Sequence, residues 1–190
     1  MIKAVIFDCF GVLTADLWKE FVATLPENQR EPARELNRAL DRGQLELKEF
    51  TREIHHLTGR EPSSVEQTIN HDITKNKKMF SLISELKDHY KVGLLSNVST
   101  DWVREVFLTA EERAMFDVIL LSYEVKRIKP DPVIYHAMCQ RLGVEPQECV
   151  FVDDSEGNCT GAKDVGMWAI QYHDFEQCKR ELAKLERDAG

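Results

Sequence analysis

The sequence predicts an α/β protein built on a doubly wound parallel sheet of about five strands, with a small helical insertion after the first strand. Short, continuous apolar runs recur along the chain, as in strands that are buried on both faces of a parallel sheet. Segments with helical spacing separate these runs, and such alternation gives parallel sheets with right-handed crossovers. A chain of 190 residues, 43% of them hydrophobic, can form one such Rossmann-like domain with an insertion.

Strands are expected where apolar runs end in polar residues. The first run, Ala4 to Phe7, is followed at once by Asp8 and then by Gly11, which lets the chain turn. Four later runs have the same character: Lys91–Asn97, Phe116–Ser122, Cys149–Asp154 and Trp168–Ile170. The carboxyl ends of parallel strands lie at one edge of a sheet, so the polar residues that follow these runs are expected to meet there.

The helical insertion is expected at residues 16–78, where the strand pattern disappears and charged segments with helical spacing replace it. Its clearest helix is Leu45–Leu57, which carries one apolar stripe and is closed by Gly59. Shorter helices are expected at Trp18–Val22, at Ala33–Leu40 and after Pro62. The chain therefore divides into a core of residues 1–15 and 79–190 and an insertion of residues 16–78.

The core is expected to resume with a helix at Met79–His89. Later core helices are expected at Asp101–Phe107, at Pro132–Leu142, in a short segment closed by Gly166, and at Phe175–Asp188. The start of the third helix is the best marked, because Asp131 suits an N-cap and proline suits the first helical position.

Charge and cysteine content limit the functional classes. The chain has 25 Lys and Arg against 33 Asp and Glu, a formal net charge of −8, which argues against nucleic acid and anionic membranes as partners. The five cysteines show no paired spacing, and neither a secretory signal nor a membrane-spanning run is recognisable. We therefore expect a cytoplasmic protein with reduced thiols. The sequence does not indicate its oligomeric state.

Acidic residues follow the first and fourth strands, and together they point to a metal site. Asp8 alone could equally cap the next element. However, the sheet edge should bring it together with Ser96, Lys129, Asp153 and Asp154. Three carboxylates would repel one another unless cations lay among them. Lys129 supplies one positive charge, and Mg²⁺, which prefers a few carboxylates together with water and phosphate oxygens, would supply two.

Such a site has the groups needed for phosphoryl transfer. Asp8 can attack phosphorus and form an aspartyl phosphate that water later hydrolyses. Ser96 would donate a hydrogen bond to a phosphoryl oxygen, and Lys129 would stabilise negative charge on the nucleophile and the phosphoryl group. The residues that follow Asp8 and Ser96 would complete the phosphate cradle; these are Phe10, Gly11 and Asn97.

Four motifs in order resemble those of the haloacid dehalogenase (HAD) superfamily. They are Phe7-Asp8-Cys9-Phe10-Gly11-Val12-Leu13, Leu95-Ser96-Asn97, Lys129-Pro130-Asp131-Pro132, and Phe151-Val152-Asp153-Asp154 with the following Ser155-Glu156-Gly157-Asn158. The chain is most similar to the small-capped branch of bacterial phosphatases that act on sugar phosphates such as glucose 1-phosphate.

The resemblance implies specific roles for these residues. Asp8 would be the nucleophile, and Mg²⁺ would be held by the Asp8 carboxylate, the Phe10 carbonyl and Asp154. Asp153 would support the metal site, and Asn158 would either orient Asp154 or cap a helix. The insertion would be a cap that closes over the substrate, a small phosphorylated metabolite.

Phe10 departs from the family pattern, because family phosphatases usually carry a second Asp there as general acid. General acid–base help is worth about 10² to 10⁴-fold. Haloacid dehalogenases, which need no such acid, carry an aromatic residue at this place, so dehalogenation through Asp8 is one alternative. Against it, Asp153 and Asp154 together would be costly without a cation, and dehalogenation needs no metal. A catalytically weak HAD-like binding protein is the second alternative.

Overall fold

The computed structural model describes residues 1–69 and 74–188 and contains one parallel sheet. Within these residues the sheet has five strands in the order β3-β2-β1-β4-β5. The strands are β1 (Ala4–Phe7), β2 (Lys91–Ser96), β3 (Val118–Leu121), β4 (Cys149–Asp153) and β5 (Trp168–Gln171). Phe7 of β1 pairs with Leu94 of β2 on one side and with Val152 of β4 on the other. The predicted doubly wound fold is confirmed, and β1 lies where the strand order reverses.

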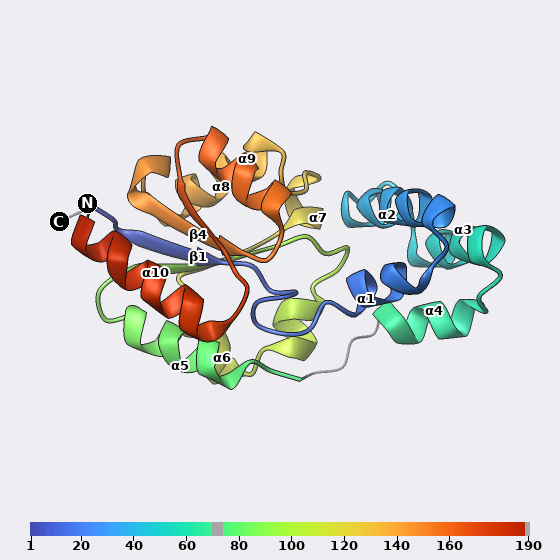
Figure 1. Cartoon of the computed structure of the whole chain (residues 1–190), viewed down its shortest axis with the longest axis horizontal. Coiled ribbons are helices and arrows are strands. Elements are labelled where there is room, and N and C mark those ends of the chain that lie inside the picture. Colours follow the sequence, from blue (N-terminus) through green and yellow to red (C-terminus); the bar gives the residue numbers. More distant parts are fainter. Residues whose placement is uncertain (70–73, 189–190) are drawn as a thin grey trace.

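Helices cover both faces of the sheet (Figure 1). One face packs against α5 (Lys77–Leu86), α10 (Phe175–Asp188) and a π-helical turn at Val103–Phe107, and the other packs against α8 (Pro132–Leu142) and α9 (Glu156–Asp164). The shorter helical elements of the core are α6 (Ala110–Arg113), α7 (Ser122–Val125) and a 3₁₀ turn at Pro146–Glu148. Along β1, Val5 and Phe7 join the first layer, while Ala4 and Ile6 join the second. This two-sided burial explains the continuous apolar run of β1.

Residues after β1 form a separate group of helices beyond the carboxyl edge of the sheet (Figure 1). The group consists of α1 (Leu17–Thr24), α2 (Glu27–Asp41), α3 (Leu47–Thr58) and α4 (Pro62–Ile69). It has a small apolar core of its own, in which Phe50 and Ile54 of α3 are fully buried against Val22 and Val65. In the described ranges, no helix has both the length and the apolar character that a membrane span requires.

The structure differs from the sequence-based expectation at several helix ends. α2 begins at Glu27 rather than Ala33, and Pro32 lies inside it, although proline removes one helical hydrogen bond. α5 begins at Lys77, where the Asn76 side chain caps it. α6 and α7, of four residues each, were not expected, since one turn is too short to show a helical period. Part of the polar connection expected before α5, residues 70–73, lies outside the described residues.

Candidate active site

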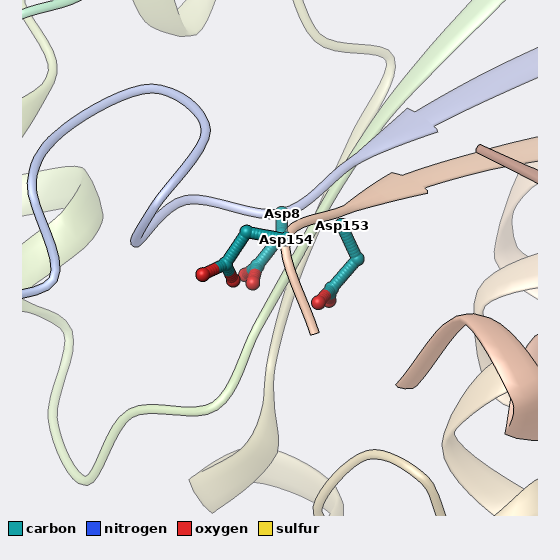
Figure 2. A group of neighbouring side chains, drawn as sticks. All are labelled: Asp8, Asp153 and Asp154. Atoms are coloured by element: carbon teal, nitrogen blue, oxygen red, sulfur yellow. The ribbon is translucent and has the colours of Figure 1, made fainter. Parts of the chain in front are cut away.

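The carboxyl ends of neighbouring strands bring three carboxylates together. Asp8 directly follows β1, Asp153 is the last residue of β4, and Asp154 follows it. Each offers an oxygen atom within 4.8 Å of the others. Figure 2 shows all three side chains pointing to the same side, beyond the ends of the two strands. This is the crevice at which doubly wound sheets bind ligands, because the chain leaves β1 and β4 in different directions.

Lys129 lies among these carboxylates. Its Nζ is 2.7 Å from Oδ1 of Asp8 and 2.7 Å from Oδ2 of Asp153, and it donates a third hydrogen bond, of 3.0 Å, to the Leu95 carbonyl. The side chain is only 1% exposed, so all three ammonium donors are satisfied within the protein. Lys129 is therefore a fixed positive charge at the end of β1.

Burial and neighbouring charges shift both members of the Asp8–Lys129 pair. Burial, followed by the negative charge of Asp153, raises the pKa of Asp8 well above its ordinary value, and Lys129 acts in the opposite direction. Burial alone would lower the pKa of Lys129, but the charges of Asp153 and Asp8 outweigh it and raise that pKa. The site thus holds more negative charge than one ammonium group balances, so a second cation would stabilise ionised Asp8.

Asp153 has no oxygen to spare for another partner. Its Oδ1 accepts hydrogen bonds from the Ser155 backbone N–H (2.8 Å) and from Nδ2 of Asn158 (3.0 Å). Its Oδ2 accepts from the same Asn158 amide (3.0 Å) and from Lys129 (2.7 Å). The Asn158 side chain thus fixes Asp153, whereas the sequence left it between orienting Asp154 and capping a helix. Asp153 and Asn158 together hold Lys129 in place.

Asp8 and Asp154 remain as the carboxylates that could hold a metal ion. Gly11, at φ +82°, brings its backbone so close to Asp154 that a Cβ atom there would lie 2.5 Å from the Asp154 Cγ. Only glycine fits this contact without displacing the carboxylate. Two adjacent carboxylate ligands beside an open edge match the preference of Mg²⁺ for few protein oxygens plus water and phosphate. The residues present therefore fit a bound Mg²⁺ ion.

The hydroxyl of Ser96 lacks a partner. Ser96 is fully buried at the end of β2, and its Oγ makes no hydrogen bond to the described residues. A buried hydroxyl without a partner costs about 1–3 kcal/mol. Such a group at the carboxyl end of a central strand is suited to bind a ligand oxygen.

The other residues that we expected to contact phosphate make contacts within the protein instead. The Asn97 side chain holds the backbone of Lys129, accepting from its N–H (2.8 Å) and donating to its carbonyl (3.2 Å). The Gly11 N–H donates to the Thr14 carbonyl at 2.7 Å, so in this conformation it does not offer the phosphate contact that we expected. The Phe10 ring stacks on Trp102, with centroids 5.9 Å apart.

Two residues of the helical insertion reach the core near the site, and sequence reasoning missed both. Lys19 of α1 donates to Oδ2 of Asp154 at 2.5 Å. The carbonyl of Asp41, the last residue of α2, accepts a 2.8 Å hydrogen bond from the Ser122 hydroxyl of α7. In a charge-rich helix, the sequence does not distinguish a lysine that contacts the site from one on the surface. Only the position of Lys19 on the first helix after Asp8 could have suggested its role.

Comparison with known proteins identifies the family. A family model described as a haloacid dehalogenase-like hydrolase matches residues 2–166. The chain belongs to this family. The resemblance drawn from the four motifs is therefore confirmed.

Individual relatives match to different extents. Bifunctional epoxide hydrolase 2 of Mus musculus is 40% identical over 70 residues, which are 37% of this chain and 13% of that much longer protein. D-ribitol-5-phosphate phosphatase of Bacteroides thetaiotaomicron is 27% identical and aligns over 97% of this chain and 98% of its own. A HAD family enzyme of the same species, crystallised as a magnesium complex, is 26% identical with a TM-score of 0.70, covering 94% and 98% of the two chains.

Proposed function

We propose that this protein is a Mg²⁺-dependent phosphatase that hydrolyses small phosphomonoesters, sugar phosphates in particular, through an aspartyl phosphate on Asp8. The observation that carries the proposal is the position of Asp8, which lies 2.7 Å from buried Lys129 and shares a crevice with Asp154. A buried carboxylate that is paired with a fixed cation is a suitable nucleophile for phosphorus. The names of the related phosphatases agree with this reaction class.

The reaction has two steps at Asp8. An Asp8 oxygen attacks phosphorus, the bond from phosphorus to the leaving oxygen breaks, and an aspartyl phosphate forms. Water then attacks this phosphorus and releases Asp8 and inorganic phosphate. Oδ1 of Asp8 already accepts from the Cys9 N–H (2.7 Å) and pairs with Lys129, and no donor of the described residues reaches Oδ2. Oδ2 is therefore the better candidate for the attacking atom.

The remaining groups stabilise charge on the transferred phosphoryl group. The buried, unpartnered Ser96 hydroxyl would donate to a phosphoryl oxygen, and Lys129 would neutralise charge that moves onto it. The Asp8 and Asp154 carboxylates, together with the Phe10 carbonyl, would hold Mg²⁺. When bound, Mg²⁺ would neutralise the crevice and draw the phosphate dianion to an acidic protein.

The helical insertion would act as the cap of this phosphatase. In our division it comprises residues 16–78, and the core comprises residues 1–15 and 79–190. The contact of Lys19 with Asp154 supports this role, because it joins α1 directly to the metal site. We also propose a cytoplasmic location, supported by five cysteines that are all buried and not joined in disulfides.

The test is product release by the purified protein, with Mg²⁺ and with a chelator. We expect phosphate release from 4-nitrophenyl phosphate and from a panel of sugar phosphates, lost on chelation and restored by added Mg²⁺. Chloride release from 2-chloropropionate that is indifferent to the chelator would instead indicate a dehalogenase. Silence on all substrates would indicate a HAD-like binding protein and contradict the proposal.

A further inference from the structure

Hydrolysis of an alkyl phosphomonoester needs an acid that the core residues of the site do not supply. The leaving alkoxide must take a proton as its bond to phosphorus breaks, and a placed acid makes this easier. Phe10, two residues after Asp8, has no proton to give. Asp8 is the proposed nucleophile, Asp154 faces the proposed metal, and both oxygens of Asp153 already accept hydrogen bonds from other residues.

The insertion offers two carboxyl groups near the site, at opposite ends of helices. Asp16 is the N-cap of α1 and accepts the Lys19 N–H at 2.9 Å. Burial raises the pKa of Asp16, but the Lys19 N–H at the positive end of the helix favours its carboxylate, so Asp16 is the weaker candidate for a proton donor. Asp41 is the last residue of α2. The negative end of a helix favours the protonated acid there.

Asp41 is fixed where the insertion meets the core. Figure 1 shows the end of α2 beside α7, and the Ser122 hydroxyl of α7 donates to the Asp41 carbonyl at 2.8 Å. The same hydroxyl accepts from the Val98 N–H at 2.9 Å, which ties Asp41 to the loop that follows Ser96. The Asp41 side chain accepts through Oδ2 from Nδ2 of Asn37 at 2.8 Å. Its Oδ1 makes no hydrogen bond within residues 1–69 and 74–188.

We infer that Asp41 is the general acid and base of the reaction. It takes the role that Phe10, which has no titratable group, cannot fill. The inference rests on the proposed phosphatase function. In the first step, an oxygen of Asp8 bonds to phosphorus, the bond from phosphorus to the alkyl oxygen breaks, and that oxygen takes the Asp41 proton to leave as an alcohol. In the second step, the Asp41 carboxylate takes a proton from water as the water oxygen attacks the aspartyl phosphate. Asp8 leaves phosphorus as a carboxylate, and Asp41 is again protonated.

Burial and a neighbouring carboxylate leave Asp41 partly protonated near neutral pH. Burial, followed by the negative charge of Asp16, raises the pKa of Asp41 to about 7. The Asn37 hydrogen bond and the positive charges of Lys129 and Arg42 act in the opposite direction. An acid with this pKa can both donate and accept a proton at neutral pH.

The test compares Asp41→Asn with the unaltered enzyme on two substrates, 4-nitrophenyl phosphate and an alkyl phosphate that the unaltered enzyme hydrolyses. The nitrophenolate leaves readily without a proton, whereas the alkoxide does not. We expect kcat/KM for the alkyl phosphate to fall by about 10² to 10⁴-fold and that for the aryl phosphate to fall by less than about 10-fold. The retained aryl activity shows that the variant is folded.

A pH profile separates proton donation from a structural role. For the unaltered enzyme, kcat/KM on the alkyl phosphate should fall as the pH rises above about 7, because Asp41 loses its proton there. This descending limb should be absent in Asp41→Asn. The matched control is Glu35→Gln. Glu35 is an exposed carboxylate of the same helix and pairs with Arg38 and Arg42. This variant should change neither kcat/KM on the two substrates nor its pH dependence.

The possible results distinguish a failure of the phosphatase proposal from a failure of the role assigned to Asp41. If the unaltered enzyme releases phosphate from neither substrate, the phosphatase proposal itself fails. If the unaltered enzyme hydrolyses both substrates, and Asp41→Asn loses activity on both equally or on neither, Asp41 is not the acid. The same conclusion follows if Asp16→Asn, and not Asp41→Asn, selectively loses activity on the alkyl phosphate.

Discussion

Buried Lys129 is the residue on which the geometry of the site depends. Its ammonium group pairs with Asp8 and Asp153 at 2.7 Å each, and in turn Asp153 is held by Asn158. A buried ion pair contributes little net stability, but removing one partner leaves an uncompensated charge and costs about 3–5 kcal/mol. The triad of Asp8, Lys129 and Asp153 therefore keeps Asp8, the proposed nucleophile, in one position rather than simply stabilising the fold.

Replacing Asp8 tests the chemistry at the residue scale. We expect Asp8→Asn to lower turnover by more than about 10⁴-fold, in the range seen when a covalent nucleophile is removed. The fold should persist, because Lys129 keeps its ion pair with Asp153 and the repulsion between two carboxylates disappears. Turnover and thermal unfolding would be measured together.

Acid quenching during turnover gives a direct measure of the same step. Mass spectrometry should detect a phosphoryl group on the unaltered protein and none on Asp8→Asn. Full turnover by the variant would mean that another group attacks phosphorus.

The loop after β1 combines two requirements that the strand itself does not meet. It must turn sharply, and it must let Asp154 approach its backbone. Gly11 meets both, with φ at +82° and a position that a Cβ atom would share with the Asp154 carboxylate. Gly59, at the end of α3, has a similar φ of +71° but no atom within 4 Å of the position of a Cβ. A comparison of the two positions therefore separates the effect of backbone strain, which both share, from that of a steric clash, which occurs only at Gly11.

At the scale of this element, Gly11→Ala and Gly59→Ala form a matched pair. Gly59→Ala should lower the free energy of unfolding by about 1–2 kcal/mol, because it forces alanine into the left-handed region. Gly11→Ala should lower it further, because its methyl group also meets the Asp154 carboxylate. Only Gly11→Ala should also weaken Mg²⁺ binding, by about 10–100-fold, since its methyl group displaces Asp154. Chemical denaturation and Mg²⁺ titration calorimetry would measure the two effects. Equal Mg²⁺ affinity in both variants would show that Asp154 is not a metal ligand.

At the scale of the whole molecule, the insertion and the core meet at the site itself. Lys19 of α1 contacts Asp154, which is 135 residues away in the sequence, and this hydrogen bond raises the pKa of Lys19. On the other side, Asp41 of α2 is tied to Ser122 of α7. Both contacts bring polar groups of the insertion to the carboxyl edge of the sheet, where our proposal places the substrate.

The Lys19 contact predicts competition with the metal. An ammonium group 2.5 Å from Oδ2 of Asp154 disfavours a second cation there. We therefore expect Lys19→Met to tighten Mg²⁺ binding by a few-fold, since an ion pair with one largely exposed partner contributes about 0.2–1 kcal/mol. Calorimetric Mg²⁺ titration would measure this. Lys48→Met, at an exposed position of α3, should leave the affinity unchanged, and a weaker affinity in Lys19→Met would show that Lys19 helps to hold the metal site.

Sequence reasoning predicted the sheet, the order of its strands along the chain and the residues at the strand ends. These features are local: two-sided burial produces continuous apolar runs, and a polar residue marks the end of each run. It was less successful with α2, where Pro32 lies inside a helix that begins at Glu27, because tertiary packing outweighed the cost of one lost hydrogen bond. It was unsuccessful with α6 and α7, whose four residues are too few for a period.

By itself, the sequence determined that Asp8, Ser96, Lys129 and the Asp153-Asp154 pair belong to one sheet edge, because parallel strands must end on the same side. Only the tertiary structure decided what each group contacts. It placed Asn97 on the backbone of Lys129, Asn158 on Asp153, Lys19 on Asp154 and Asp41 beside Ser122. Contacts between distant segments leave no periodic trace in a sequence, since they depend on how the helical insertion packs against the core.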